Sequence, residues 1–561
     1  MSQKKKETTK TNALRVIPLG GMREIGKNMT VFEYGDEIII IDCGMAFPDT
    51  RMPGIDIVIP DFTYLRENQE KIRGIIVTHG HEDHIGAIPY FLRKINVPIY
   101  GTTMTLGILG PKLAEHKLLN SAEMITVSPG DFFELGVFGV ELIRTNHSVP
   151  DSAAIAVSTP LGNIIITGDF KIDPTPVAGK MIDLTRFGEY GEQGVLLLIS
   201  DSTNVEKPGF TMSEKHVGET LEAQFKNCDE RIIIATFASN VHRMQQVIWI
   251  CHKYGRKLAV SGRSMENILH VAKSLGYLEI PDGVLIELSA IGRYPKNKIC
   301  VLTTGSQGES MSALYRIAFA GHRQINIGAG DRVILAASTI PGNEKAVYRV
   351  INELVRQGAD VVYSNMAEVH ASGHASQEEL KIMLSLTHPT YFMPGHGEYR
   401  HLKAHAQLAH SVGVPDENIF ISENGRVLEI SEKGAKLGAI VPSGKVLVDG
   451  LGVGDVGSVV LRDRKHLSQD GLIVLVLTLS SDDGSLISGP DIVSRGFIYV
   501  RESEEMLDEL KHRVLNVLKK CQEDRITDWM AIKSELKSDI SSFLYSKTQR
   551  SPMILPVIME V

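Results

Sequence analysis

The chain has 561 residues, which is too long for one hydrophobic core and predicts roughly two to four domains. Hydrophobic residues make up 43% and charged residues 22%, ordinary globular usage that excludes a disordered or collagenous chain. The 59 basic and 67 acidic residues give a net charge of -8, which excludes the basic balance of a general nucleic-acid binder. Five scattered cysteines, never in a C-x-x-C pair, argue against a disulfide framework and a thiolate zinc site.

Nothing in the sequence predicts a membrane or export segment. The most apolar run, Leu472 to Leu479, has 8 residues, whereas a membrane-spanning helix needs about 20. The lysines near the start are not followed by the apolar stretch of a secretory signal. We therefore expect a cytoplasmic protein without membrane contact.

The first part of the chain predicts a β-rich domain. Residues 1–11 have the composition of a disordered basic tail, and residues 12–210 form the first part of the domain. Its expected strands cover residues 14–19, 29–34, 37–42, 74–77, 140–144, 163–167 and 195–200. Polar loops with candidate chemistry follow several of these strands.

Residues 211–379 predict a second, inserted α/β domain. Expected strands at 231–236, 257–261, 299–303, 332–336 and 360–364 alternate with helical patterns, which is typical of a parallel sheet with crossover helices. Residues 380–449 return to short helices and strands and complete the first domain. Residues 450–561 predict a linker and a small α/β domain.

This last domain has strands expected near Val459, Ile473 and Phe497 and a final strand over residues 553–559. It also has a helix whose apolar stripe we expect in the domain core. The stripe consists of Leu507, Leu510, Val514 and Leu518.

The strongest functional signal is the segment Thr78-His-Gly-His-Glu-Asp-His84, directly after an apolar strand. Imidazoles two positions apart can bind one cation, and the carboxylate and imidazole just beyond can reach a second. Gly80 removes a Cβ atom that would obstruct the turn. A solvated surface loop is the alternative interpretation, and it is disfavoured because crowding imidazoles without a cation is costly.

Further donors follow later strands: His147, Asp169 and His396. Each taken alone is more often an ordinary loop residue. Together with His79, His81, Asp83 and His84 they supply the nitrogen and oxygen donors of a two-cation site.

This arrangement resembles the metallo-β-lactamase superfamily, an αββα sandwich whose site lies at the sheet ends. The resemblance implies that His79, His81 and His147 bind one metal, that Asp83, His84 and His396 bind the other, and that Asp169 bridges them, with Asp42 as a support. The inserted α/β domain narrows the resemblance to the β-CASP branch, and the match to the ribonuclease J family runs over nearly the whole chain. It is carried by segments such as Gly20-Gly-Met-Arg-Glu-Ile-Gly-Lys-Asn28, Ser200-Asp-Ser-Thr-Asn204, Thr304-Gly-Ser-Gln-Gly-Glu309 and His370-Ala-Ser-Gly-His374.

The family resemblance also implies residues for substrate binding and proton transfer. His374, with Asp201 as its partner, is the candidate proton donor, and Asp83 also belongs to the catalytic set. A phosphate of the substrate is expected at two segments, which are Ser239, Asn240 and Val241, and His370, Ala371, Ser372, Gly373 and His374. The alternative for Asn240 is a helix-capping residue in a strand-to-helix turn. A structural calcium is expected near Gly54, Asp56 and Asp449.

The segment ending in Lys27-Asn28 nearly matches a nucleotide phosphate-binding loop. Asn28 stands where that loop needs a hydroxyl, and a β-rich run follows where it needs a helix. We therefore reject a nucleoside-triphosphatase function.

The sequence thus predicts a metal-dependent ribonuclease with two zinc ions, manganese being the alternative. The family implies 5′ to 3′ exonuclease activity with preference for a 5′ monophosphate, and single-strand endonuclease activity, in mRNA decay and rRNA maturation. Expected partners are single-stranded RNA, a second copy in a homodimer or homotetramer, a paralogue in a hetero-oligomer, and an RNA-degradation complex or the ribosome. The alternatives are a hydrolase of carboxylic esters or thioesters, a non-catalytic RNA-binding subunit, and a DNA-directed nuclease.

Overall fold

The computed structural model describes residues 13–226, 228–340, 342–481, 484–497 and 504–561. The expected tail at 1–11 lies outside these residues. The chain forms two compact units: residues 1–46 with 59–445, and residues 47–58 with 446–561. None of the described helices is both long enough and apolar enough to cross a membrane.

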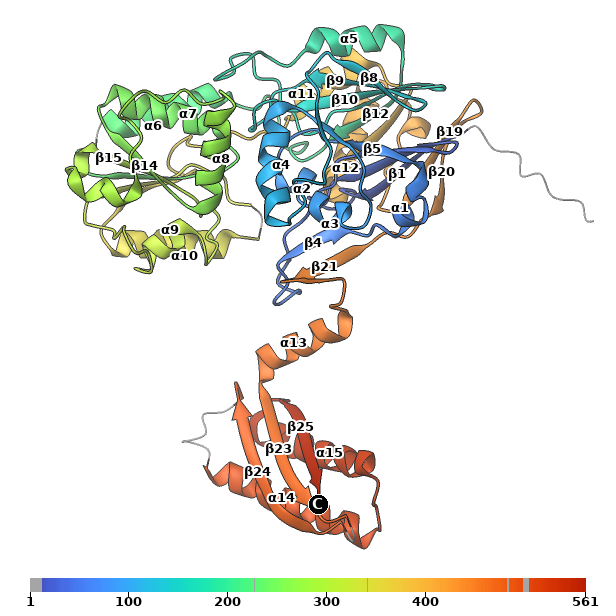
Figure 1. The fold of residues 1–561 in the computed structure, drawn as a ribbon, viewed down its shortest axis with the longest axis vertical. Helices are drawn as coiled ribbons and strands as arrows, with labels where there is room; N and C mark the ends of the chain where they lie inside the picture. Colours follow the sequence, from blue (N-terminus) through green and yellow to red (C-terminus); the bar gives the residue numbers. More distant parts are fainter. Residues whose placement is uncertain (1–12, 227, 341, 482–483, 498–503) are drawn as a thin grey trace, which may run out of the picture. The chain divides into compact units, whose positions relative to one another are not determined.

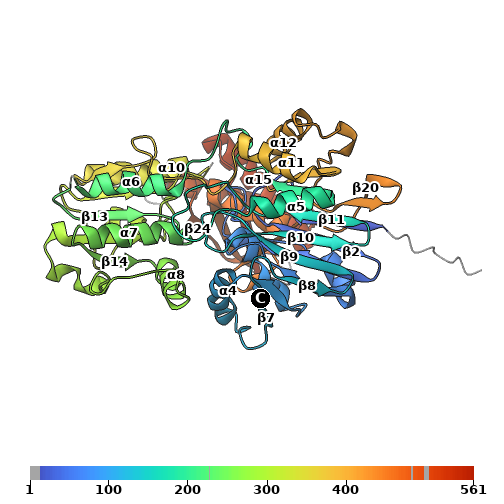
Figure 2. The same ribbon diagram turned by 90° about the horizontal axis from the view of Figure 1, so that it is seen from above.

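The first unit contains a sandwich of two β-sheets (Figures 1 and 2). One sheet has the order β20-β19-β1-β2-β3-β5-β6-β7 and the other the order β18-β12-β11-β10-β9-β8. The strands of the first sheet are β1 (Leu14–Gly20), β2 (Met29–Tyr34), β3 (Glu37–Ile41), β5 (Ile72–Ile76), β6 (Ile99–Gly101), β7 (Met124–Thr126), β19 (Arg426–Ser431) and β20 (Gly434–Ile440). Those of the second are β8 (Phe132–Leu135), β9 (Phe138–Arg144), β10 (Ala153–Thr159), β11 (Gly162–Ile166), β12 (Val195–Asp201) and β18 (Tyr391–Gly395).

Apolar side chains from both sheets fill the space between them. Phe32 and Ile39 of the first sheet share one buried cluster with Leu142, Ile155 and Leu197 of the second. Alternate residues of the second sheet point outward and pack against helices, as expected for strands covered on both faces. The sandwich therefore has a helical layer outside its sheets.

Helices cover the sandwich on both sides, as Figure 2 shows for α5, α11 and α12 on one side and α4 on the other. They are α1 (Thr63–Glu67), α2 (Glu82–Ile85), α3 (Ile88–Leu92), α4 (Thr103–Glu115), α5 (Leu184–Gln193), α11 (Gln377–Thr387) and α12 (Tyr399–Ser411). The helix α11 begins with a capping box made by Ser376 and Glu379. The αββα architecture predicted from the sequence is confirmed.

The inserted domain is a parallel sheet with the order β14-β15-β13-β16-β17. Figure 1 shows α6 and α7 on one side of its strands and α9 and α10 on the other. Its elements are α6 (Glu214–Lys226), β13 (Ile232–Ala235), α7 (Val241–Lys253), β14 (Lys257–Ser261), α8 (Arg263–Ser274), β15 (Ile299–Thr303), α9 (Ala313–Ala318), β16 (Arg332–Leu335), α10 (Glu344–Arg356) and β17 (Asp360–Val362). The strand that comes first in the sequence of this domain, β13, is central in its sheet. Ligands of such sheets bind at the carboxyl ends of the strands on either side of the central one.

The second unit has its own core. One three-stranded sheet has the order β24-β23-β25 and packs against two helices, with Leu475, Leu510, Val514, Leu536 and Phe543 buried. A second has the order β22-β21-β4 and belongs to this unit apart from residues 59, 60 and 445. The elements are β4 (Ile57–Pro60), β21 (Lys445–Asp449), β22 (Gly452–Val453), α13 (Ser458–Asp470), β23 (Leu472–Leu479), β24 (Leu486–Arg495), α14 (Glu504–Glu523), α15 (Trp529–Thr548) and β25 (Met553–Glu560).

One predicted strand of this unit is wrong. Val459 lies in α13, a helix, because the apolar run at 459–461 is too short to distinguish the two periodicities and charged residues follow it. The strand expected near Phe497 is not seen at that residue, which follows β24 in a bend, and the next residues lie outside the described part of the chain. The strands at Ile473 and 553–559 and the core position of Leu510, Val514 and Leu518 are confirmed.

Candidate metal centre

Strand ends place the predicted donors of the first unit. The loop after β5 carries His79 and His81, and the short helix α2 carries Asp83 and His84. The loops after β9, β11 and β18 carry His147, Asp169 and His396. The structure brings all seven side chains together, although they span more than three hundred positions of the sequence.

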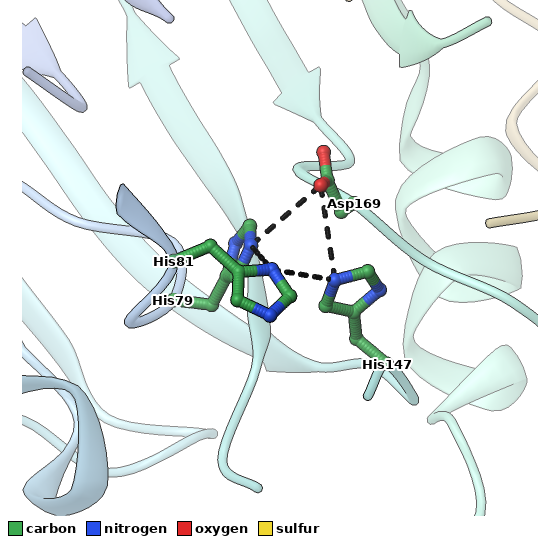
Figure 3. A group of neighbouring side chains, drawn as sticks. All are labelled: His79, His81, His147 and Asp169. Atoms are coloured by element: carbon green, nitrogen blue, oxygen red, sulfur yellow. Dashed lines mark hydrogen bonds and ion pairs between the residues drawn. The ribbon is translucent and has the colours of Figure 1, made fainter. Parts of the chain in front are cut away.

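Three histidines and one carboxylate form the first group (Figure 3). The Nδ1 atom of His81 lies 3.0 Å from the Nε2 atoms of both His79 and His147. Oδ2 of Asp169 lies 3.6 Å from Nε2 of His79 and 3.8 Å from Nε2 of His147. One ligand atom from each residue therefore faces a common point, as four-coordinate zinc requires.

Asp83, His84, Asp169 and His396 form a second group. Oδ1 of Asp169 lies 3.3 Å from Nε2 of His84, and Oδ2 of Asp83 lies 3.3 Å from Nε2 of His396. The two carboxylate oxygens of Asp169 thus face different groups. This is the geometry expected of a carboxylate that bridges two cations.

The buried polar atoms of these groups fit divalent cations. In the described part of the chain, Oδ1 of Asp169 and both ring nitrogens of His396 are buried, and their close polar contacts are with other members of the site, such as Nδ1 of His396 at 2.8 Å from Oδ1 of Asp169. The site thus crowds buried nitrogen and oxygen donors against one another, which is costly unless a ligand satisfies them. Nitrogen and oxygen donors without thiolates suit zinc and manganese.

The nitrogens that face away from the two groups have partners of their own. Nδ1 of His84 lies 2.7 Å from Oδ2 of Asp42, and Nδ1 of His147 donates to the Gly373 carbonyl at 2.7 Å. Nε2 of His81 lies 3.0 Å from Oγ of Ser239 in the inserted domain. Partners of this kind fix the ring orientation of metal-binding histidines.

Burial controls the charge of the first group. It lowers the pKa of His79 and His147 well below the usual value and that of His81 to about 4. Neutral imidazoles keep the lone pair that a cation needs. In the second group burial also opposes charge, but the carboxylates of Asp169, Asp42 and Asp83 raise the pKa of His84.

A pair beside the second group combines an acid with a histidine. Nδ1 of His374 lies 2.7 Å from Oδ2 of Asp201, and Oδ1 of Asp201 lies 3.6 Å from Nδ1 of His396. Burial opposes the charged form of His374, but the carboxylates of Asp201 and Asp169 raise its pKa. The carboxylates thus favour the protonated form of an imidazole that lies next to the candidate cation positions.

The turn between β13 and α7 approaches the first group through Ser239. Its neighbour Asn240 caps α7, since its side-chain oxygen accepts the backbone N–H of Arg243 at 3.0 Å, and Val241 is buried. The Asn240 side chain therefore caps helix α7, as the alternative interpretation predicted. A role of this turn in phosphate binding stays a prediction.

The segment 370–374 lies against the same groups. Oγ of Ser372 accepts from Asn204 at 2.8 Å, while Ala371 is buried. A Cβ atom on Gly373 would lie 2.5 Å from the His147 ring, so only glycine permits this approach. Burial, followed by the charge of Arg243, lowers the pKa of His370 to about 2.

Several residues around the site carry no recognisable signal of their own in the sequence. Arg243 is fully buried, forms a two-point ion pair with Glu214 and lies 3.4 Å from Nδ1 of His370. Thr78 contacts both Asp42 and His79, and Asn28 contacts His84. Asn28 ends the family segment that begins at Gly20, but nothing in one sequence shows which distant residues touch.

The residues expected at the calcium site belong to the second unit. Oδ2 of Asp56 accepts the backbone N–H of Gly450 at 2.7 Å. The Arg464 guanidinium donates to the Gly54 carbonyl at 3.1 Å and forms an ion pair with Asp449. The positively charged side chain of Arg464 thus already contacts two of the three residues expected to bind calcium.

Comparisons with known proteins agree with this architecture. Family profiles match in four segments: the metallo-beta-lactamase superfamily at 22–188, the ribonuclease J beta-CASP domain at 229–354, the Zn-dependent metallo-hydrolase RNA specificity domain at 359–422, and the ribonuclease J C-terminal domain at 459–561. A crystal structure of a protein of unknown function from Enterococcus faecalis V583 matches with a TM-score of 0.52 and 17% identity. That match covers 74% of this chain and 100% of the other, and it supports the fold alone.

Fold and donor set define a metallo-β-lactamase-type protein with an inserted β-CASP domain. Ribonuclease J2 of Bacillus subtilis (strain 168) is 42% identical to this chain, over 98% of this chain and 99% of its own length. Ribonuclease J 1 of Streptococcus pyogenes is 44% identical over 98% of both chains, and ribonuclease J of Thermus thermophilus is 45% identical over 98% and 95%. The chain belongs to the ribonuclease J family.

Proposed function

We propose that the protein is a metal-dependent ribonuclease that hydrolyses phosphodiester bonds of single-stranded RNA. The observation that carries the proposal is the placement of Asp169 between two groups of nitrogen and oxygen donors. Each group offers four ligand atoms within 4.8 Å of one another. The names of the relatives support RNA as the substrate class.

We propose two zinc ions as the resident cations, with manganese as the alternative. His79, His81, His147 and Asp169 would hold the first, and Asp83, His84, His396 and Asp169 the second. Such a pair supplies a water with lowered pKa and neutralises the phosphodiester under attack. The neutral state of His79, His81 and His147 prepares the first group for this role.

His374 serves as the proton donor to the departing 3′ oxygen. The neighbouring carboxylates raise its pKa and so favour the protonated ring, and Asp201 holds the ring by its Nδ1 atom, which leaves Nε2 for the substrate. Its ring centroid lies 5.2 Å from that of His147 and 5.7 Å from that of His396, so the donor stands beside both groups.

The 5′ phosphate of the substrate binds at Ser239 and along residues 370–374. Hydroxyls and backbone N–H groups suit a phosphate, and the site needs no long basic side chain at its surface. The buried guanidinium of Arg243 adds positive charge behind His370. A phosphate held one nucleotide from the cations yields 5′ to 3′ release of mononucleotides.

The decisive test of the metal mechanism uses His81→Ala and 5′-monophosphorylated RNA. We expect loss of cleavage and of about one cation per chain, with unchanged circular dichroism. The exposed His252 provides the control, and His252→Ala keeps wild-type activity. Full turnover by the His81 variant or by cation-free protein contradicts the proposal.

The substrate is tested by comparing 5′-monophosphorylated, 5′-triphosphorylated and 5′-hydroxyl RNA with a matched DNA strand and a thioester. We expect fastest digestion of the monophosphorylated RNA, slow digestion of the triphosphorylated RNA, and no thioester hydrolysis. Equal rates on all three RNA ends contradict the phosphate site. Faster cleavage of DNA or thioester contradicts RNA as the substrate.

We further propose a cytoplasmic role in mRNA decay and rRNA maturation, as a homodimer, a homotetramer or an assembly with a paralogue. Light scattering of the purified protein, alone and with a paralogue, tests the assembly.

A structural calcium at Gly54, Asp56 and Asp449 stays a prediction. The Arg464 side chain would compete with that calcium for the Gly54 carbonyl and the Asp449 carboxylate. Calcium titration of the wild type and of Arg464→Gln tests that site.

A further inference from the structure

The segment Gly20 to Asn28 is the sequence motif that the proposed function leaves unexplained. It joins β1 to β2, and its residues Met22 and Glu24 form bridges with Gly397, next to the donor His396. Its last residue is fixed to the metal-binding loop through the main chain. The Asn28 N–H donates to the Asp83 carbonyl at 2.9 Å, and the Asn28 carbonyl accepts from Gly44 at 2.9 Å.

The Asn28 side chain reaches two members of the second donor group. Its amide nitrogen lies 3.0 Å from Nε2 of His84 and 3.5 Å from Oδ2 of Asp83, and the residue is buried. In the described part of the chain, the other side chains with close contacts to this carboxylate are the histidines His84 and His396. Asn28 is therefore the uncharged side chain that donates a hydrogen bond to the Asp83 carboxylate.

Two glycines of the motif make room for this placement. A Cβ atom on Gly20 would lie 1.7 Å from the Lys27 carbonyl oxygen, and one on Gly21 would lie 2.3 Å from the side-chain oxygen of Asn28. Neither position tolerates a side chain unless the segment moves. The glycine pair thus shapes the loop for Asn28 and not for a nucleotide phosphate.

Asp83 needs such a contact more than the other carboxylate of the group does. Its side chain is 29% exposed, whereas that of Asp169 is 2% exposed. His84 is fixed differently, because Asp42 holds its Nδ1 atom and directs Nε2 toward the group. A cavity of about 50 Å³ borders Asn28, His84, Asp169 and His396 on the side of the sheets.

We propose that Asn28 is a positioning residue for the second cation. With a cation held by Nε2 of His84, the Asn28 amide would have Asp83 as its remaining acceptor in this group. That hydrogen bond would orient the Asp83 carboxylate for holding the cation. This inference rests on the two-cation site of the proposed function, and outer hydrogen-bond partners of ligands typically change metal affinity about 10- to 100-fold.

The test measures cation binding apart from catalysis. Full-length wild type, Asn28→Ala and Asn28→Ser are dialysed against buffers of fixed free Zn²⁺ and analysed for zinc per chain. The same proteins are titrated with Co²⁺ and followed by visible absorption. We expect the first equivalent to bind as in the wild type and the second to bind at least 10-fold more weakly in both variants.

Asn424→Ala is the matched control. Asn424 holds the same loop, accepting from the Met22 N–H at 3.1 Å and donating to Glu24 at 2.7 Å, without contacting a donor residue. We expect the Asn424 variant to bind two equivalents of cation with wild-type affinity. Wild-type affinity for the second equivalent in the Asn28 variants, or equal losses in the Asn424 variant, overturns the inference. A wild type that binds two cations but does not cleave RNA contradicts the proposed function instead.

Discussion

His374 and Asp201 form a direct contact in which Nδ1 of the histidine lies 2.7 Å from Oδ2 of the carboxylate. Asp201 raises the pKa of His374 against the effect of burial, so its removal lowers that pKa. Because a proton donor works only below its pKa, the alkaline limb of the pH–rate profile should move to lower pH in Asp201→Asn. At pH 8 we expect kcat to fall about 100-fold, with two cations retained per chain.

A substrate that needs no proton separates this role from a structural one. A 3′-thio linkage leaves as a thiolate, so His374→Gln and Asp201→Asn should cleave it within a few-fold of the wild type. The double variant should be no worse than His374→Gln alone, because the two residues act as a unit. Equal losses on the oxygen and sulfur linkages contradict the proton-donor role.

Ser239 links the inserted domain to the first donor group through the 3.0 Å contact with Nε2 of His81. We expect Ser239→Ala to weaken the first cation about 10-fold, because His81 loses the partner that orients its ring. The hydroxyl also belongs to the proposed phosphate site. KM should therefore rise more for 5′-monophosphorylated than for 5′-hydroxyl RNA.

Zinc analysis and steady-state kinetics of the same preparation check both effects. Ser264→Ala, at an exposed position of α8, is the control. Unchanged zinc content with a raised KM would leave Ser239 as a phosphate contact only. An equal rise of KM for both RNA ends contradicts the phosphate contact.

The local patterns of the sequence were sufficient for most strands and for singling out donors that the structure brings together, whereas their roles as metal ligands come from the family resemblance and stay a prediction. His79 to His84 stand in one segment after a buried strand, and strand periodicity is a short-range property. The parallel sheet of the inserted domain followed from the alternation of β13 to β17 with helices. By contrast, three apolar residues at 459–461 could not distinguish a strand from α13.

Contacts between distant segments were not predictable from one sequence. Asn28 meets Asp83, Ser239 meets His81, and the Gly373 carbonyl meets His147 only because two sheets and an inserted domain converge. The buried Arg243 has the same origin, since its partners lie on α6 and after β16. Asn240 differs from these residues, because its position before a helix could be predicted from the local sequence. The structure shows that it caps α7.

We expect His370 to stay neutral over the pH range of an activity assay. Burial and the nearby guanidinium of Arg243 lower its pKa to about 2. The ratio of KM between His370→Gln and the wild type, for 5′-monophosphorylated RNA, should therefore stay constant from about pH 5.5 to 8. The phosphate itself titrates near pH 6, but it does so equally for both proteins. A ratio that grows severalfold at acidic pH would show that the histidine binds in its charged form.

His405 should make the protein less stable as the pH falls. The side chain is fully buried against Phe392, and its Nδ1 lies 2.9 Å from Oγ of Ser202. Its Nε2 has no hydrogen-bond partner among the residues that the structure describes. Burial lowers its pKa to about 3 from the ordinary 6.5, so below pH 6.5 the unfolded chain binds a proton that the folded chain does not. Stability is therefore lost from pH 6.5 downward until about pH 3.

Between pH 7 and pH 5 this single group should cost about 2 kcal/mol of unfolding free energy. We expect His405→Gln to lose less stability than the wild type over this interval, by about that amount. Urea unfolding of the sandwich at a fixed zinc concentration measures the difference, with His410→Gln, an exposed position of the same helix, as the control. The comparison between variants matters here, because protonation of the proposed metal-binding histidines destabilises all three proteins alike. Parallel losses in the wild type and in the His405 variant would show that the ring is not held neutral by its burial.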